Sequence, residues 1–248
     1  MTTPAARTAL VTGGTRGIGL GIARALAAEG WHLALCGVRD ADAVAAVLET
    51  FEGRAEYVRA DVGSTADRTR LAAAIAERYG AVNALVNNAA VSPKTAFKER
   101  LGCLNGDLDA WRQVFELNFF APLALSRGLA APLARGKGAI VNITSIAGHA
   151  IHPFAGSAYS TSKAALSALT REMAVEFAEL GVRVNAVAPG EIETAMIGPE
   201  YESLIPRIPM HRLGRPEEVA AAVFQLCTED FGYVTGTEVF VTGGQHLY

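Results

Sequence analysis

The chain has 248 residues, half of them hydrophobic, and a formal net charge of −3. No apolar run approaches the roughly 20 residues needed to span a bilayer, and there is no block of basic residues, so the sequence argues against a membrane span and against nucleic acid as a partner. The three cysteines lack CxxC spacing, which favours a reducing, cytoplasmic location, and the scattered histidines predict no metal site.

Short apolar segments alternate with alanine-rich helical patterns along the chain. We expect strands at 8–12, 32–37, 55–61, 83–89, 138–145, 182–190 and 237–244. We expect helices at 20–30, 41–51, 68–80, 108–133, 157–181 and 215–229. Strands that are apolar on both faces must be covered by helices on both sides, so the pattern predicts an α/β fold with a doubly wound parallel sheet of about seven strands. No linker divides the chain, and we expect one domain over 1–248.

Two irregular segments, 91–107 and 191–215, interrupt this alternation. Ligands of such sheets bind beyond the carboxyl ends of the strands, where both segments are expected, so they are the predicted substrate side. Phe97, Phe154 and Met196 are candidate apolar walls there, although each is equally compatible with a core position. Neither segment specifies a substrate.

The first predicted strand leads directly into a glycine-rich turn, "TGGTRGIG", with Gly13, Gly17 and Gly19 at the start of the first helix. Glycines let a phosphate approach the backbone, and a helix N-terminus favours its negative charge. The pattern indicates dinucleotide binding, with an ordinary strand–helix turn as the alternative. Asp61, at the end of the third strand, could accept a hydrogen bond from an adenine amino group, but a capping or surface aspartate would look the same.

Tyr159 and Lys163 are separated by four positions in "YSTSK" and share one helix face. A free phenol has a pKa of about 10, and a fixed ammonium one turn away would lower it and favour proton transfer near neutral pH. The alternative is a buried tyrosine beside a surface lysine.

Six motifs occur in the order and approximate spacing of the short-chain dehydrogenase/reductases. They are "TGGTRGIG" (12–19), "NNA" (87–89), Asn118, Ser145, "YSTSK" (159–163) and "PGEIET" (189–194). The chain resembles this family from position 8 to 244, and most of all its 3-oxoacyl-[acyl-carrier-protein] reductases, partly through 208–220. The resemblance implies a Rossmann-type dinucleotide-binding oxidoreductase domain.

The resemblance also implies the catalytic residues Asn118, Ser145, Tyr159 and Lys163. Tyr159 would transfer the proton, Lys163 would lower its pKa and hold the nicotinamide ribose, Ser145 would donate to the substrate carbonyl, and Asn118 would hold a water in a relay with Lys163. A serine that merely closes a strand and a structural buried asparagine remain the alternatives. The loop between Ser145 and Tyr159 is one residue longer than is usual in the family.

Further positions of the family motifs correspond to cofactor contacts. These are Gly13, Thr15, Arg16, Gly17, Ile18, Gly19, Arg39, Asp61, Val62, Asn88, Ala89, Tyr159, Lys163, Pro189, Gly190, Ile192 and Thr194. The chain departs from the family at Ala90, where glycine is common.

The residues after the second strand bear on the choice of nicotinamide cofactor. Enzymes that prefer NAD carry an acid at the end of this strand, where this chain has Gly37. Arg39 and Arg16 instead suit a 2′-phosphate, so we expect NADP(H). Because Asp40 is adjacent, NAD(H) remains the alternative.

The predicted reaction is hydride transfer between the cofactor and a small-molecule carbonyl or secondary alcohol, which includes reduction of a 3-oxoacyl thioester. A sugar, polyol or steroid alcohol dehydrogenase is the alternative within the same fold, and a non-catalytic nicotinamide-binding regulator is the alternative outside enzymology. Surplus apolar residues on the helices at 108–133 and 157–181 predict a homo-oligomer, a tetramer by resemblance, with a dimer next.

Overall fold

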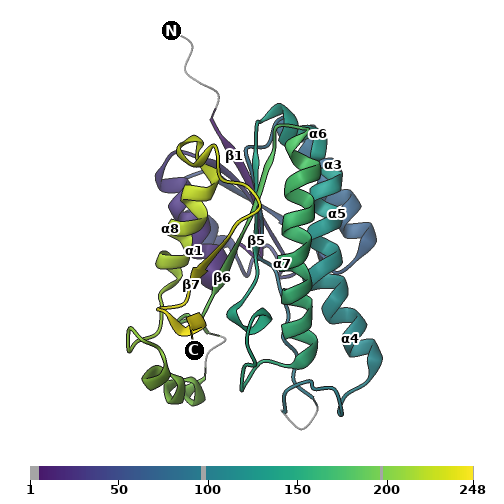
Figure 1. The fold of residues 1–248 in the computed structure, drawn as a ribbon. Helices are drawn as coiled ribbons and strands as arrows, with labels where there is room; N and C mark the ends of the chain where they lie inside the picture. The colour runs from purple at the N-terminus through teal and green to yellow at the C-terminus, as the bar shows by residue number, and fades with distance from the viewer. Residues whose placement is uncertain (1–5, 96–98, 196–197, 248) are drawn as a thin grey trace.

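The computed structural model describes residues 6–95, 99–195 and 198–247, and these residues form a seven-stranded sheet (Figure 1). The strands are β1 (Thr8–Thr12), β2 (His32–Gly37), β3 (Ala55–Arg59), β4 (Ala84–Asn87), β5 (Ala139–Ile143), β6 (Arg183–Pro189) and β7 (Glu238–Val241). Their order is β3-β2-β1-β4-β5-β6-β7, and all neighbours are parallel. The predicted α/β doubly wound fold is confirmed.

Two layers of helices cover this sheet (Figure 1). One layer contains α1 (Gly17–Ala28), α2 (Ala45–Glu49) and α8 (Pro216–Cys227). The other contains α3 (Thr65–Tyr79), α5 (Ala121–Gly128), α6 (Ala130–Arg135) and α7 (Ser157–Ala178), with α4 (Leu108–Phe115) beside the beginning of α7. The chain also forms short 3-10 segments, namely η2 (Ile146–Gly148), η3 (Pro199–Arg207), η4 (Glu229–Phe231) and η5 (Gln245–Leu247). No helix in the described part of the chain is both long and apolar enough to cross a membrane.

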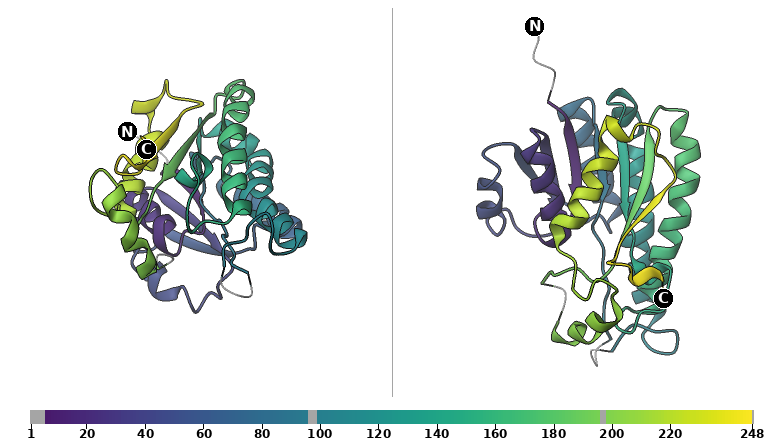
Figure 2. Two further views of the ribbon diagram at one scale, coloured as in Figure 1. Left: turned by 60° about the horizontal axis from the view of Figure 1, so that its bottom comes forward. Right: turned by 60° about the vertical axis from the view of Figure 1, so that its left-hand side comes forward.

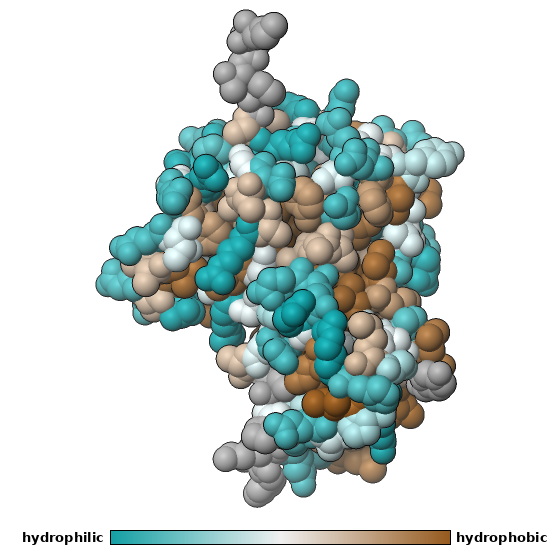
Figure 3. Space-filling model, turned by 90° about the vertical axis from the view of Figure 1, so that its left-hand side faces the viewer, coloured by the Kyte–Doolittle hydropathy of each residue, from teal (hydrophilic) through white to brown (hydrophobic). Residues whose placement is uncertain are grey.

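The connections that follow the strands gather at the carboxyl edge of the sheet, at the lower end of Figure 1, and the left view of Figure 2 turns this end toward the viewer. The chain builds β1, β2 and β3 outward and then returns to place β4 on the other side of β1. This reversal opens a crevice for ligands beyond β1 and β4. The surface on the α1 and α8 side is mixed, with apolar side chains showing between polar ones toward the lower end (Figure 3).

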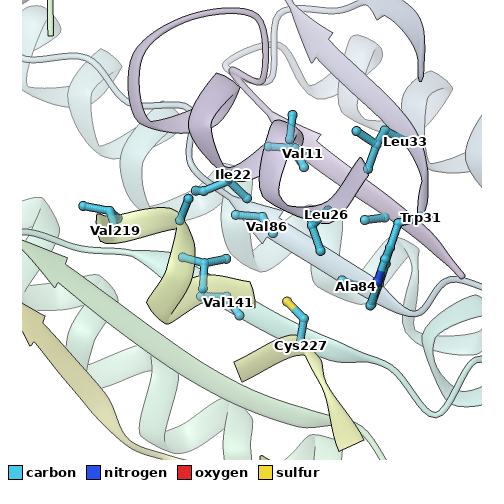
Figure 4. Packing of buried hydrophobic residues seen from close by; sticks show 14 of the residues in the cluster. Val11, Ile22, Leu26, Trp31, Leu33, Ala84, Val86, Val141, Val219 and Cys227 are labelled. Carbon is cyan, nitrogen blue, oxygen red and sulfur yellow. The ribbon is translucent and has the colours of Figure 1, made fainter. Parts of the chain in front are cut away.

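Alternate residues of the central strands enter two cores. All residues of β1, β4 and β5 are buried. Val11 and Val86 pack in the cluster that includes Ile22 of α1 (Figure 4), whereas Leu10 and Leu85 belong to the cluster under α3, α5 and α7. Burial on both faces explains why these strands read as continuous apolar runs.

The long helix expected over 108–133 is not continuous. It consists of α4, a π-helical turn η1 (Glu116–Phe120), α5 and α6, and Leu129 departs from helical geometry between the last two. A π turn inserts one extra residue and often marks a functional position. Here the inserted turn contains Asn118, which is fully buried.

Candidate active site

The turn after β1 has glycines at positions where a side chain would clash or would need an unfavourable backbone conformation. Gly13 and Gly17 have φ values of +64° and +52°, a region in which glycine is favoured. A Cβ at Gly19 would lie 2.3 Å from the Gly13 carbonyl oxygen and 2.6 Å from Asn88 Nδ2. The turn therefore requires glycine on steric grounds.

Helix α1 begins from this turn without a side-chain cap. Arg16 occupies the N-cap position in an extended conformation, and its side chain makes no capping hydrogen bond. Thr15 is buried just before it, and Ile18 and Gly19 lie in the first turn. The first N–H groups of a helix have no partner within the helix and favour an anion, so this end of α1 can hold a phosphate.

The residues after β4 are bonded to the same turn. Asn88 Nδ2 donates to the carbonyl oxygens of Thr12 and Gly13 at 2.9 and 3.3 Å, and the Ala89 N–H donates to Thr12 Oγ1 at 3.0 Å. Asn88 is expected to contact the cofactor, and its amide nitrogen also fixes the turn. The structure thus gives Asn88 a positioning part in this site.

Asp61 and Val62 follow β3, and both are engaged within the protein. Asp61 Oδ1 accepts a hydrogen bond from the Gly63 N–H at 2.8 Å, and the Asp61 N–H donates to Asp67 Oδ2 at 2.8 Å. Val62 is buried, and its carbonyl accepts from Arg68 Nη1 at 2.8 Å. Asp61 closes a turn with one carboxylate oxygen, which is compatible with either role expected for this position.

The segment after β6 returns to the glycine turn. The Gly190 N–H donates to the last residue of β7 at 2.9 Å, and Ile192 forms a parallel bridge with Gly214. Thr194 lies beside the turn, because a Cβ built on Gly17 would contact its side chain at 3.5 Å. The "PGEIET" motif and the glycine motif therefore lie side by side.

Arg39 and Asp40 follow β2 at the surface, and their side chains have different surroundings. Asp40 Oδ1 pairs with Arg59 Nη1 at 2.7 Å. Arg39 and Arg16 are exposed, and neither forms an ion pair with any part of the chain that the structure describes. Their guanidinium charges are not neutralised, whereas the charge of Asp40 is.

Tyr159, Lys163 and Ser145 come together beyond β5. Lys163 Nζ lies 5.7 Å from the centre of the Tyr159 ring and donates to the Ile143 carbonyl at 2.6 Å. Tyr159 is half-buried, and the Ser145 side chain lies close enough to lower the pKa of its hydroxyl. Ser145 Oγ also accepts from the Ala147 N–H at 3.1 Å. The lysine is buried, not on the surface, so the alternative of a surface lysine is wrong.

The electrostatics of this group differ from the expectation. Burial raises the pKa of Tyr159, its hydrogen bond with Ser145 lowers that pKa, and the charge of Glu191 raises it. Lys163 was expected to lower it, but burial lowers the pKa of Lys163 itself to about 7. A lysine that is only partly charged near neutral pH stabilises a phenolate weakly, which explains the difference.

Asn118 connects the π turn to α7 and to the chain after β4. Its Oδ1 accepts from the Val91 N–H at 2.9 Å, and its Nδ2 donates to the Val91 carbonyl at 3.0 Å and to Ser162 Oγ at 3.1 Å. Ser162 Oγ in turn donates to the Tyr159 carbonyl at 2.7 Å. These bonds hold Asn118 between the chain after β4 and α7, which is compatible with either role expected for it.

The 191–215 segment and the loop before Tyr159 meet on the predicted substrate side. The rings of Phe154 and Tyr201 lie 4.8 Å apart, and those of His152 and Tyr201 lie 6.1 Å apart. Phe154 is half-buried and packs against 191–215, which is compatible with either position expected for it. The other two wall candidates, Phe97 and Met196, lie outside the described residues.

Sequence reasoning missed a second polar group on this side. His152 Nε2 lies 2.6 Å from Glu191 Oε1, and Gln245 Nε2 donates to the same oxygen at 3.2 Å. His152 and Glu191 are 8% and 5% exposed. The available signal was an acid, Glu191, next to the proline–glycine pair at the end of an apolar strand. Its partners His152 and Gln245 are distant in sequence, so the group could not be predicted.

Comparison with known proteins finds one family along almost the whole chain. Residues 13–246 match the family described as Enoyl-(Acyl carrier protein) reductase. Protein FixR of Bradyrhizobium diazoefficiens is 45% identical over 96% of this chain and 86% of its own length. Galactitol 2-dehydrogenase (L-tagatose-forming) of Cereibacter sphaeroides is 40% identical over 97% of this chain and 95% of its own length.

Solved structures agree with the fold. The RhlG/NADP active-site complex of Pseudomonas aeruginosa has 34% identity and a TM-score of 0.88, with 98% of each chain covered. A 3-oxoacyl-[acyl-carrier protein] reductase with bound NAD from Brucella melitensis has 33% identity and a TM-score of 0.89, with 98% of this chain and 92% of that chain covered.

Proposed function

This chain belongs to the short-chain dehydrogenase/reductase family and is a nicotinamide-dependent oxidoreductase of carbonyls and secondary alcohols, and from this premise we propose its catalytic residues and cofactor preference. Tyr159 transfers the proton and Ser145 orients the substrate carbonyl. Lys163 supports Tyr159 and holds the nicotinamide ribose. Asn118 holds a water in a relay with Lys163, with a structural role as the alternative. The observation that carries this proposal is the buried Lys163, 5.7 Å from the centre of the Tyr159 ring and bonded to the end of β5, at the edge of the sheet where Ser145 lies and α1 begins uncapped.

Each residue has a defined part in carbonyl reduction. A bound nicotinamide supplies or accepts the hydride. The Ser145 hydroxyl donates to the carbonyl oxygen, which favours the negative charge that develops there. The Tyr159 hydroxyl donates its proton to that oxygen, and in alcohol oxidation the phenolate removes the proton again. The uncapped N–H groups of α1 bind the pyrophosphate.

For the cofactor we propose NADP(H), with NAD(H) as the alternative. Arg39 and Arg16 are exposed cations without ion pairs among the described residues, and Asp40 is neutralised by Arg59. This arrangement favours a 2′-phosphate over a bare ribose hydroxyl. The NADP complex among the similar structures supports this choice, and the complex with NAD keeps the alternative open.

For assembly we propose a homotetramer, with a homodimer as the alternative. We define the α4–α5 patch as Leu108, Trp111, Phe115 and Phe120, which line one surface groove. Leu108 and Phe120 are 69% and 47% exposed. Exposed apolar groups of this size favour association with a second copy. The three unpaired cysteines fit a reducing compartment, and we propose a cytoplasmic location.

Replacing Tyr159 by Phe tests the proposed chemistry. The substitution removes the hydroxyl and retains the ring, so we expect kcat to fall by about 10²–10⁴-fold, while binding of NADPH changes little. Turnover is measured by nicotinamide absorbance with a panel of ketones, and cofactor binding by calorimetry. Unchanged turnover would show that another group transfers the proton.

A further inference from the structure

Glu191 is a buried acid that the proposed reaction does not use. It lies two residues after the end of β6 and is 5% exposed. Its backbone is fixed, because its carbonyl accepts from the Gly214 N–H at 2.8 Å. Burying a carboxylate is costly unless hydrogen-bond donors satisfy it. The donors around its two oxygens therefore indicate whether the protein alone satisfies this carboxylate.

One oxygen, Oε1, has both of its donors from the protein. His152 Nδ1 accepts from the N–H groups of Phe154 and Ala155 at 3.1 and 3.0 Å, so it carries no proton. The ring proton is therefore on Nε2 and points to Glu191 Oε1, 2.6 Å away. The Gln245 amide adds the second donor to the same oxygen at 3.2 Å. The two donors hold the carboxylate in one orientation.

The other oxygen, Oε2, has no donor among the residues that the structure describes. Glu191 and Ser145 follow the neighbouring parallel strands β6 and β5 at the same edge of the sheet. Tyr159 is held at this edge too, because Lys163, 5.7 Å from the centre of its ring, bonds to the last residue of β5. The charge of Glu191 also raises the pKa of Tyr159 and of Tyr201. Oε2 is therefore an acceptor at the same edge of the sheet as the proposed catalytic residues.

We propose that Glu191 recognises the substrate by accepting a hydrogen bond at Oε2 from a hydroxyl or protonated amino group near the reacting carbonyl. His152 and Gln245 act as positioning residues for it. The inference rests on the proposed function and adds a substrate class, namely ketones with a hydrogen-bond donor close to the carbonyl. A purely structural carboxylate would have donors on both oxygens. A substrate with an anionic group at this place would be repelled.

The test compares matched ketones. The first set carries a hydroxyl one, two or three carbons from the carbonyl, the second replaces that hydroxyl by methyl, the third by ammonium and the fourth by carboxylate. For wild type we expect kcat/KM to be at least about 10-fold higher with hydroxyl or ammonium than with methyl, because a hydrogen bond to a charged acceptor is lost otherwise. Comparing the hydroxyl-bearing with the ammonium-bearing ketones shows which of the two donor groups the site prefers.

Glu191→Gln is the informative variant. Its amide oxygen still accepts from His152 Nε2, but its NH2 group replaces the acceptor at Oε2. We expect the preference for donor-bearing ketones to disappear and the carboxylate-bearing ketones to improve. Glu193→Gln is the matched control, since Glu193 is exposed two residues away and should keep the wild-type preference. Thermal unfolding with bound NADP+ verifies that both variants fold.

Binding of the same ketones to the enzyme–NADP+ complex, measured by calorimetry, separates the two proposals, since that complex cannot reduce a ketone. Selective binding of donor-bearing ketones without any turnover with NADPH would overturn the proposed function and support the inference. Turnover without a preference for donors, or a preference that Glu191→Gln leaves intact, would overturn the inference alone. Absence of both binding and turnover across the sets would overturn the inference as well.

Discussion

Lys163 is 2% exposed, and its Nζ donates to a backbone carbonyl, with no carboxylate paired to it in the described part of the chain. Burial lowers its pKa from 10.5 to about 7. Between these two pH values the unfolded chain binds a proton at this lysine and the folded chain does not. The free energy of unfolding from this group therefore rises with pH above about 7, and below pH 7 its contribution is constant.

Lys163→Met removes this pH dependence. In urea unfolding of the cofactor-free protein, we expect the stability of wild type relative to the variant to increase by about 1.4 kcal/mol per pH unit above pH 7. The measurement covers pH 6 to 9. The exposed Lys137→Met serves as the control and should show no such trend. A difference that stays flat across the range would contradict a lowered pKa at Lys163.

Arg39→Ala tests the proposed cofactor preference at a single side chain. The guanidinium has no ion pair among the described residues and follows β2 at the surface. If it binds the 2′-phosphate, its loss should raise KM for NADPH about 10-fold or more, while KM for NADH stays close to the wild-type value. Arg24→Ala, exposed on α1, is the control. Equal effects on both cofactors would assign Arg39 another role.

For single residues, the sequence predicted contacts between positions that are close together along the chain. Tyr159 and Lys163 are four positions apart on one helix, so their proximity follows from helix geometry alone. Glu191 and His152 are 39 positions apart, and no periodicity connects them. The pKa directions also could not be foreseen, because they depend on burial of both groups and on the charge of Glu191.

Among the elements, strands were predicted better than helices. Continuous apolar runs located all seven strands, with the differences confined to their ends, where the chain turns into the site. The break in the helix over 108–133 was not predicted. The π turn there holds Asn118, whose amide bonds to Val91, 27 positions away. The hydrophobic pattern within one helix carries no information about a hydrogen bond to a residue outside that helix.

Helix α4 begins with a side-chain cap that can be tested on its own. Asp107 Oδ1 accepts from the Ala110 N–H at 2.7 Å, so Asp107→Ala should lower the free energy of unfolding by about 1 kcal/mol. Asp109→Ala is the matched control. It removes an exposed pair with Arg112, and such pairs contribute little. Urea unfolding measures both, and equal effects would mean that the cap adds no stability.

For the whole molecule, the parallel sheet brings the separate motifs together. Six motifs distributed over 12–194 meet because successive strands end at the same edge. This convergence followed from the βα alternation. The substrate side did not follow, since it depends on contacts between loops, such as the approach of Phe154 to Tyr201. The surface that would contact another copy was predicted only as an excess of apolar helix residues.

The proposed assembly can be tested at the α4–α5 patch. Phe120 is 47% exposed on the π turn and lines the same groove as Leu108, Trp111 and Phe115. A charge there would be buried without a partner in an interface, so Phe120→Glu should shift the tetramer toward smaller species. Light scattering after size exclusion measures the mass at several concentrations. Val38→Glu, which charges another exposed apolar position after β2, should keep the wild-type mass. If Phe120→Glu also keeps it, the chain associates through another surface or not at all.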